Sequence, residues 1–248
     1  MSGDPDTLSK RQTTLSKQVN MPVVVFDLDD TLYDTLTYLH GGLKEVSAFL
    51  APILSIDKKS VFLELKDLAA VSHEKVFDRF LLEKGGHTKK LVKRCITIYR
   101  THTPHIQLYP EAKRCLEHLS KYFPLYIVTD GNKLVQMRKL AALHVEKWIK
   151  KAFCTHHYGL KSAKPSTYCF TKIASLEKVK PKELIYIGDN PKKDFVALKK
   201  AGFCTLRVRT GQHKDVYIDE AHEALHQIPN LSQLDAELIL RLVVRNVS

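Results

Sequence analysis

The chain alternates between short apolar runs and longer segments in which apolar residues recur every three or four positions. Four short runs, rich in aliphatic residues, are residues 22–26, 124–129, 184–188 and 203–209. Such runs are typical of parallel strands that are buried on both faces. The segments with helical spacing near them are residues 110–122, 133–143, 165–179 and 191–202. The pattern predicts an α/β protein whose core is a Rossmann-like parallel sheet with helices on both faces.

The region after the first strand has a different pattern. Residues 37–105 contain four amphipathic segments and no convincing strand, which indicates an all-helical domain inserted into the sheet domain. The predicted organisation is a flexible leader at 1–20, a core at 21–36 and 106–212, the inserted helical domain at 37–105, and a helical tail at 213–248 that packs on the core.

Composition and charge narrow the class of protein. The 248 residues carry a formal net charge of +12, but the lysines are spread over many segments without interleaved aromatic residues. Solvated helix faces explain this pattern better than nucleic-acid binding does. Five scattered cysteines and the lack of a signal-peptide pattern or a membrane-spanning run predict a cytoplasmic protein without a membrane partner. The sequence leaves open whether it is a monomer or a homodimer.

Carboxylates are concentrated where the predicted strands end. Asp27 and Asp29 follow the first strand, and Asp189 follows the run at 184–188. Ligands of open α/β sheets bind at the carboxyl ends of the strands. Two carboxylates this close repel each other unless a cation or a shared proton intervenes. A third carboxylate from another strand would complete an oxygen site suited to Mg²⁺.

Four motifs in order make the pattern recognisable. They are "DLDDT" at 27–31, Thr129 closing a strand, Lys164 before a helix, and the pair Asp189 and Asp194 in "GDNPKKD". Together they resemble the haloacid dehalogenase superfamily, most of whose members are phosphatases. The resemblance covers about residues 21–211, and the helical insertion is similar to the C1-type cap of subfamily I.

The resemblance implies a role for each matching residue. Asp27 would be the nucleophile that forms an aspartyl-phosphate. Asp29 would protonate the leaving alcohol and later take a proton from the attacking water. Thr129 would hydrogen-bond a phosphoryl oxygen, and Lys164 would offset the charge of the nucleophile and the phosphate.

The same resemblance implies a Mg²⁺ cofactor. Its ligands would be the carboxylates of Asp27 and Asp189 and the backbone carbonyl of Asp29. Asp194 would lie close to the metal and orient a water molecule or Lys164. Asp130, next to Thr129, is included among the phosphate-binding positions, although a turn or helix-capping role for its side chain is the preferred interpretation.

Four cationic or titratable residues of the insertion are candidates for substrate specificity: Arg79, Arg100, His102 and His105. A cation at the entrance to the site could hold a second acidic group of the substrate. For each of them a solvated or purely structural role is the more common alternative.

The function predicted is a magnesium-dependent hydrolase of a small phosphate monoester, either a nucleoside 5′-monophosphate or a sugar phosphate. A phosphomutase of the same superfamily is the alternative that shares both aspartates. True dehalogenation is disfavoured, because the enzymes that perform it lack an acid at the Asp29 position. A non-catalytic basic binding protein on the same fold is the third alternative.

Overall fold

The computed structural model describes residues 21–245, so the predicted leader at 1–20 lies outside the described residues. Its centre is a six-stranded sheet with the strand order β3-β2-β1-β4-β5-β6, in which every neighbouring pair is parallel. The strands are β1 (Val23–Phe26), β2 (Leu125–Thr129), β3 (Lys151–Cys154), β4 (Leu184–Gly188), β5 (Cys204–Val208) and β6 (His226–Ile228). The predicted parallel α/β fold is confirmed.

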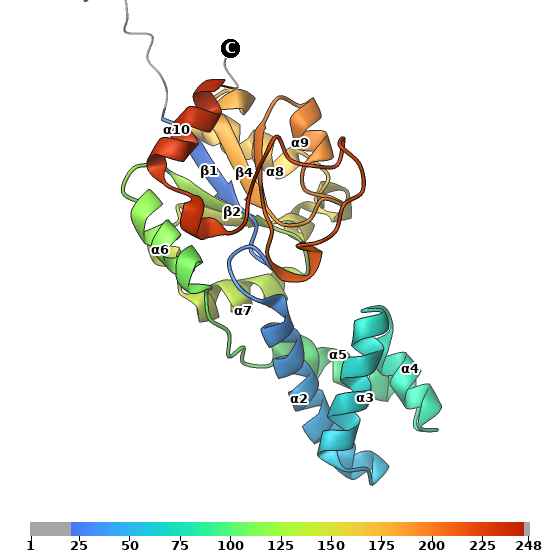
Figure 1. Cartoon of the computed structure of the whole chain (residues 1–248). Helices are drawn as coiled ribbons and strands as arrows, with labels where there is room; N and C mark the ends of the chain where they lie inside the picture. The colour runs from blue at the N-terminus through green and yellow to red at the C-terminus, as the bar shows by residue number, and fades with distance from the viewer. Residues whose placement is uncertain (1–20, 246–248) are drawn as a thin grey trace, which may run out of the picture.

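Helices cover both faces of this sheet (Figure 1). Alternate residues of β1 point to opposite faces, so Val24 and Phe26 join one hydrophobic cluster while Val23 and Val25 join the other. The first face is covered by α6 (Pro110–Leu119), α7 (Lys133–Leu143) and α10 (Ala236–Arg245). The second face is covered by α8 (Tyr168–Glu177) and α9 (Val196–Lys200).

Four helices between β1 and α6 form a separate layer that extends away from the sheet (Figure 1). They are α2 (Thr35–Leu54), α3 (Lys58–Val71), α4 (Val76–Glu83) and α5 (Lys89–Thr101). Their buried side chains, among them Leu43, Leu50, Leu65 and Phe80, make a hydrophobic cluster distinct from those of the sheet. We call these four helices the helical insertion.

The short 3₁₀ turns lie in the connecting segments. They are η1 (Val145–Lys147), η2 (Thr155–Tyr158), η3 (Leu160–Ser162), η4 (Pro181–Glu183), η5 (Gly211–His213) and η6 (Leu231–Gln233).

The topology places the first strand at the switch point of the sheet. β1 pairs with β2 on one side and with β4 on the other, and Phe26 is in register with Ile127 and Ile187. Asp27, Thr129 and Asp189 therefore emerge at the same edge, where ligands bind in folds of this kind.

Two strands were not predicted from the sequence. β3 has only four residues and begins with the exposed Lys151, so it lacks a long apolar run. The segment 213–248, predicted as a helical tail, also contains the strand β6, because His226–Ile228 pairs with β5. A three-residue edge strand with one side chain buried carries too little hydrophobic pattern to be detected. The tail does end in a helix, α10, on the core.

The helix predicted at 191–202 is also shorter than expected, since α9 covers only Val196–Lys200. Upstream of it the chain makes a turn, in which Asn190 N donates to Asp194 Oδ2 at 3.0 Å and Lys192 N donates to Asn190 Oδ1 at 3.0 Å. These bonds satisfy backbone groups that a helix would have used. The turn directs Asp194 back toward the end of β4.

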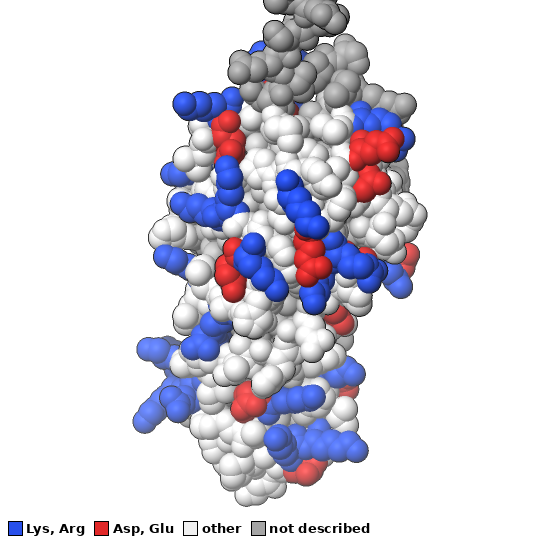
Figure 2. Space-filling model, turned by 90° about the vertical axis from the view of Figure 1, so that its left-hand side faces the viewer, with Lys and Arg blue, Asp and Glu red and all other residues white. Residues whose placement is uncertain are grey.

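Charged side chains are dispersed over the surface. Figure 2 shows Lys and Arg scattered over both the upper and lower parts of one face, with Asp and Glu among them. This dispersal agrees with solvated faces. Among the helices of residues 21–245, none is both long and apolar enough to span a bilayer.

Candidate active site

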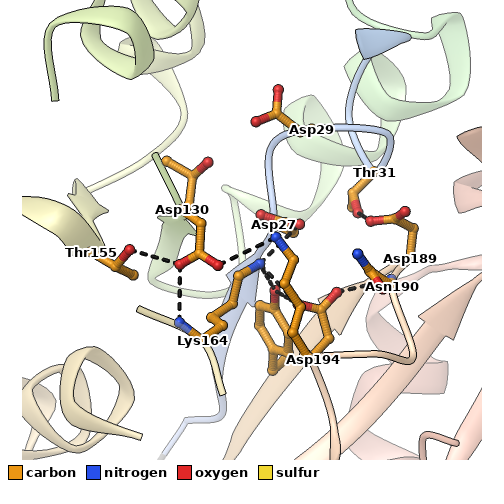
Figure 3. Close-up of polar contacts among 12 residues, drawn as sticks. Asp27, Asp29, Thr31, Asp130, Thr155, Lys164, Asp189, Asn190 and Asp194 are labelled. Carbon is orange, nitrogen blue, oxygen red and sulfur yellow. Dashed lines mark hydrogen bonds and ion pairs between the residues drawn. The ribbon is translucent and has the colours of Figure 1, made fainter. Parts of the chain in front are cut away.

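The centre of the site is a buried ion-pair network at the end of β1. Lys164 Nζ lies 3.0 Å from Asp27 Oδ2 and 2.9 Å from Asp194 Oδ1, and all three side chains are at most 4% exposed (Figure 3). Tyr186 of β4 completes the network, because its hydroxyl lies 2.8 Å from Lys164 Nζ and 3.1 Å from Asp194 Oδ1. One cation is therefore shared by two buried carboxylates.

Gly188 makes room for this network. A Cβ atom at this position would lie 2.6 Å from Asp194 Oδ2, closer than real contacts allow. The glycine immediately before Asp189 therefore lets Asp194 approach the end of β4.

The negative charge at the site exceeds the buried positive charge. Burial raises the pKa of Asp27 to about 7, even though Lys164 opposes the shift. Burial also raises the pKa of Asp189, although a hydrogen bond from His213, whose Nδ1 lies 2.9 Å from Asp189 Oδ2, acts in the opposite direction. Two carboxylates with raised pKa values at one strand edge indicate a site that favours an additional cation.

The donor set suits Mg²⁺. Oxygens of Asp27, Asp189 and Asp194 all lie within 4.8 Å of one another. Carboxylate oxygens are hard ligands of the kind that Mg²⁺ prefers. Both oxygens of Asp194 already have partners, in Lys164 and Tyr186 for Oδ1 and Asn190 N for Oδ2. Within residues 21–245, no group donates a hydrogen bond to Asp27 Oδ1, which leaves that oxygen available.

The raised pKa of Asp27 predicts a dependence of stability on pH. Between its ordinary value of 3.8 and about 7, folded Asp27 holds a proton that the unfolded chain has lost. Unfolding is therefore increasingly favoured as pH rises through this window. We compare the free energies of unfolding of Asp27→Asn and the wild type in urea titrations with EDTA. The variant's value minus the wild type's value should be larger at pH 7 than at pH 4, by about 1 kcal/mol or more. A difference that does not change with pH would contradict the raised pKa.

Asp29 lies beside Asp27 in the sequence but faces another direction. Its carboxylate points away from Asp27 (Figure 3). Oδ1 accepts a hydrogen bond from the Tyr33 hydroxyl at 2.6 Å and contacts Lys139 Nζ at 2.7 Å, and Oδ2 accepts from Gln136 Nε2 at 2.9 Å. The structure therefore allows the backbone of Asp29, but not its carboxylate in this orientation, to join the cluster around Asp27.

Lys139 is the cation that compensates Asp29. Burial raises the pKa of Asp29, but the charge of Lys139 and hydrogen bonds from Lys139, Tyr33 and Gln136 outweigh burial and hold it below its usual value. Lys139 itself is 6% exposed and lies over the ring of Tyr38, 4.6 Å from its centroid.

Lys139→Met should raise the pKa of Asp29, because the variant keeps most of the side-chain volume but removes the charge. If Asp29 acts as acid and base, the limb of the pH–rate profile that reports it should move to higher pH by about one unit or more. Lys133→Met, at the exposed start of the same helix, is the matched control and should leave the profile unchanged. An identical profile for both variants would exclude this role of Lys139.

Thr129 is oriented by a residue of α7. Gln136 Nε2 donates to Thr129 Oγ1 at 2.7 Å, so the threonine oxygen accepts from Gln136 and its own hydrogen is free to point into the site. This arrangement suits a donor to a phosphoryl oxygen.

The side chain of Asp130 supports the site instead of facing a ligand. Its Oδ1 accepts hydrogen bonds from Thr155 Oγ1 at 2.7 Å and Lys164 N at 3.0 Å, and its Oδ2 lies 3.3 Å from Lys193 Nζ (Figure 3). These contacts attach the segment carrying Lys164 to the end of β2. A carboxylate used in this way would repel phosphate, so the structure supports the turn-forming interpretation for the side chain of Asp130.

The four candidates of the helical insertion are not brought together. Arg79 donates to the carbonyls of Leu68 and Ser72 within the insertion, so its guanidinium has a structural role. His102 is buried, with its Nδ1 2.7 Å from Tyr99 O, and it lines a hollow with His105 on another side of the insertion. Only Arg100 lines the cavity that adjoins Asp29.

Several site residues were missed by sequence reasoning: Thr31, Tyr33, Gln136, Lys139, Tyr186 and His213. Thr31 Oγ1 lies 3.4 Å from Asp189 Oδ1, so the threonine of "DLDDT" also contacts the aspartate that follows β4. The sequence did contain one signal for Gln136 and Lys139, which both lie on α7. Gln136 and Lys139 share a helix face with Leu140 and Leu143, so they are polar residues at positions where a packed helix normally carries apolar ones.

Comparisons with known proteins agree with this geometry. A model of the haloacid dehalogenase-like hydrolases matches residues 21–202. A glyceraldehyde 3-phosphate phosphatase of Methanopyrus kandleri is 28% identical over 202 residues, which cover 78% of this chain and 86% of that protein. The human N-acylneuraminate-9-phosphatase is 25% identical over 199 residues, which cover 72% of this chain and 78% of that protein.

Solved structures show the same fold. A predicted phosphoglycolate phosphatase of Haemophilus somnus superposes with a TM-score of 0.64 at 18% identity, covering 86% of this chain and 96% of that one. A 2-haloacid dehalogenase of Pseudomonas syringae superposes with a TM-score of 0.61 at 23% identity, covering 92% of this chain and all of that one. At such identities the likeness concerns the fold alone.

Proposed function

The chain belongs to the haloacid dehalogenase-like hydrolases, and from this membership we propose that it is a magnesium-dependent phosphatase of a small phosphate monoester. The substrate class is a sugar phosphate or a nucleoside 5′-monophosphate. The names of the relatives, phosphatases of glyceraldehyde 3-phosphate and of N-acylneuraminate 9-phosphate, support the sugar phosphate more.

One observation carries the proposal. The carboxylate of Asp27 has one oxygen paired with Lys164 at 3.0 Å and the other without a hydrogen-bond donor in residues 21–245, at the end of the central strand. A buried carboxylate kept partly free at a ligand-binding edge is typical of a nucleophile and metal ligand more than of a structural ion pair.

The side chains at the edge divide the first half of the reaction between them. Asp27 attacks phosphorus and forms an aspartyl-phosphate. Thr129, oriented by Gln136, donates to a phosphoryl oxygen. Lys164 offsets the negative charge of the nucleophile as the phosphate approaches, and Asp194 and Tyr186 hold its ammonium in place.

Asp29 serves the leaving group. Its carboxylate leaves Tyr33, Gln136 and Lys139, which hold its pKa low, takes up a proton from solvent and turns toward the ester oxygen. It gives this proton to the departing alcohol, and the carboxylate then takes a proton from the water that attacks the aspartyl-phosphate on Asp27. The helical insertion begins at Thr35, directly after this segment, and we assign it the role of a cap over the site.

Asp27, Asp189 and the backbone carbonyl of Asp29 would hold Mg²⁺, with Asp194 beside them. When bound, the metal supplies charge neutralisation for the phosphoryl group and the nucleophile.

The test is release of inorganic phosphate from p-nitrophenyl phosphate with Mg²⁺ and after treatment with EDTA. We expect activity that disappears with EDTA and returns with added Mg²⁺. Activity that persists both in EDTA and in Asp27→Asn would refute the proposal.

A further inference from the structure

A cavity of about 460 Å³ lies between α2, α4 and α5 of the helical insertion and reaches Gln212 of the core. This volume is in the range of small-molecule sites. Six of its twelve lining residues are apolar or aromatic: Leu39, Leu43, Val76, Phe77, Ile96 and Tyr99.

The cavity opens beside the acid–base residue. Thr35 and Gln212 both line it. The hydroxyl of Thr35 lies 3.5 Å from Asp29 Oδ1, and the backbone N–H of Gln212 donates to Asp30 Oδ2 at 3.2 Å. In the proposed reaction the leaving alcohol departs toward Asp29, so the cavity lies on the side of the site where the alcohol part of the ester would be placed.

The apolar wall indicates what kind of alcohol part it takes. Leu39, Ile96 and Tyr99 are only partly buried, although they pack against the cluster of the insertion. Contact of an apolar surface with water is unfavourable, so a ligand that covers this surface with an apolar group gains binding free energy. The other six lining residues are polar or charged, namely Thr35, His73, Lys75, Asp78, Arg100 and Gln212, so the wall suits a ligand that is partly apolar and partly polar.

The charged side chains at the cavity are mostly cationic. Arg100 and Lys75 line it, and within residues 21–245 neither side chain takes part in an ion pair or hydrogen bond. Arg79, by contrast, has its guanidinium engaged by two carbonyls. Asp78 is the acidic lining residue, and its Oδ1 lies 3.4 Å from His87 Nε2. An arginine without a partner beside an apolar wall is suited to bind a carboxylate.

We propose that this cavity binds the alcohol part of the substrate, and that this part combines an apolar acyl or aryl group with a carboxylate held by Arg100. The inference rests on the proposed phosphatase function and narrows it. It separates such acidic, partly apolar esters from small neutral sugar phosphates, which have neither a carboxylate for Arg100 nor an apolar group for the side chains of Leu39 and Ile96.

Two aryl esters test the carboxylate directly. 4-(Carboxymethyl)phenyl phosphate and 4-methylphenyl phosphate release phenols of similar acidity and differ in the acidic group. We expect kcat/KM to be about tenfold or more higher for the acidic ester in the wild type, with the preference lost in Arg100→Met. Arg94→Met is the matched control, because Arg94 is on the same helix but lies over Phe49, 5.9 Å from the ring centroid, outside the cavity. It should keep the preference.

The apolar wall is tested with Ile96→Asn, which should raise KM for both aryl esters while leaving that for glycerol 3-phosphate unchanged. Binding of 4-hydroxyphenylacetate, measured by calorimetry, examines the cavity without any catalysis. Arg100→Met should weaken this binding about tenfold or more.

The outcomes separate the two proposals. If phosphate is released but glycerol 3-phosphate is preferred, or if Arg100→Met leaves both the ester preference and the binding unchanged, the cavity assignment is wrong and the phosphatase stands. If no ester is hydrolysed but 4-hydroxyphenylacetate binds in an Arg100-dependent manner, the cavity assignment stands and the phosphatase proposal fails.

Discussion

Asp27→Asn should lower phosphatase activity by about 10⁴-fold or more, because the amide cannot attack phosphorus and form the acyl phosphate. The substitution changes few atoms and removes a carboxylate that is 3% exposed, while Lys164 keeps its contact with Asp194 at 2.9 Å. The fold should therefore be retained. The measurement is phosphate release at saturating substrate with Mg²⁺.

Asp34→Asn is the control for this variant. Asp34 lies in the same segment, but its side chain caps α2 by accepting from Leu36 N, a role that Asn fills equally well. Its activity should equal that of the wild type. If Asp27→Asn retained even a tenth of the activity, Asp27 would not be the nucleophile.

Lys164→Met should have the largest effect on stability. Lys164 is 1% exposed on its side chain and is the cation nearest to both Asp27 and Asp194. Removing one partner of a buried ion pair leaves uncompensated charge, which typically costs about 3–5 kcal/mol. We expect a loss of that size in the free energy of unfolding at pH 7, measured by urea titration, together with loss of activity.

Two comparisons identify the cause of that loss. At pH 5 the destabilisation should be smaller, because Asp27, with its pKa raised to about 7, is then protonated in the folded protein. Lys161→Met, at an exposed position three residues earlier, should have no comparable effect. A loss of equal size at both pH values would point to packing instead of charge.

Much of this architecture was predictable because it depends on local pattern. The apolar runs of β1, β2 and β4 are each fully buried, so their hydrophobic residues are continuous and the motif aspartates follow immediately. The prediction of the hydrolase family from these motifs is confirmed. β6 was missed for the opposite reason, since its three residues are stabilised by pairing with β5 and not by a pattern of their own.

The residues of the site also divide into those that local sequence pattern places and those that tertiary contacts place. The placement of Asp27, Thr129 and Asp189 at one edge follows from parallel strands, whereas the contacts of Lys139 and Gln136 with Asp29 join residues 107 to 110 positions apart. No spacing rule connects residues at such distances along the chain. Arg79 and Arg100 look equivalent in the sequence, yet one binds carbonyls and the other lines the cavity.

The sequence by itself determined the sheet, the order of its chemical motifs and the carboxylates at the strand ends, because periodicity and turn residues are local properties. Only the tertiary structure decided that Lys164 is shared by two buried aspartates, that Asp29 is held by α7, and that a partly apolar cavity with an unpaired arginine adjoins it. These features depend on burial and on which side chains meet across the fold. Burial determines how strongly the charged groups interact with one another, and the packing of α2, α4 and α5 determines the shape of the cavity.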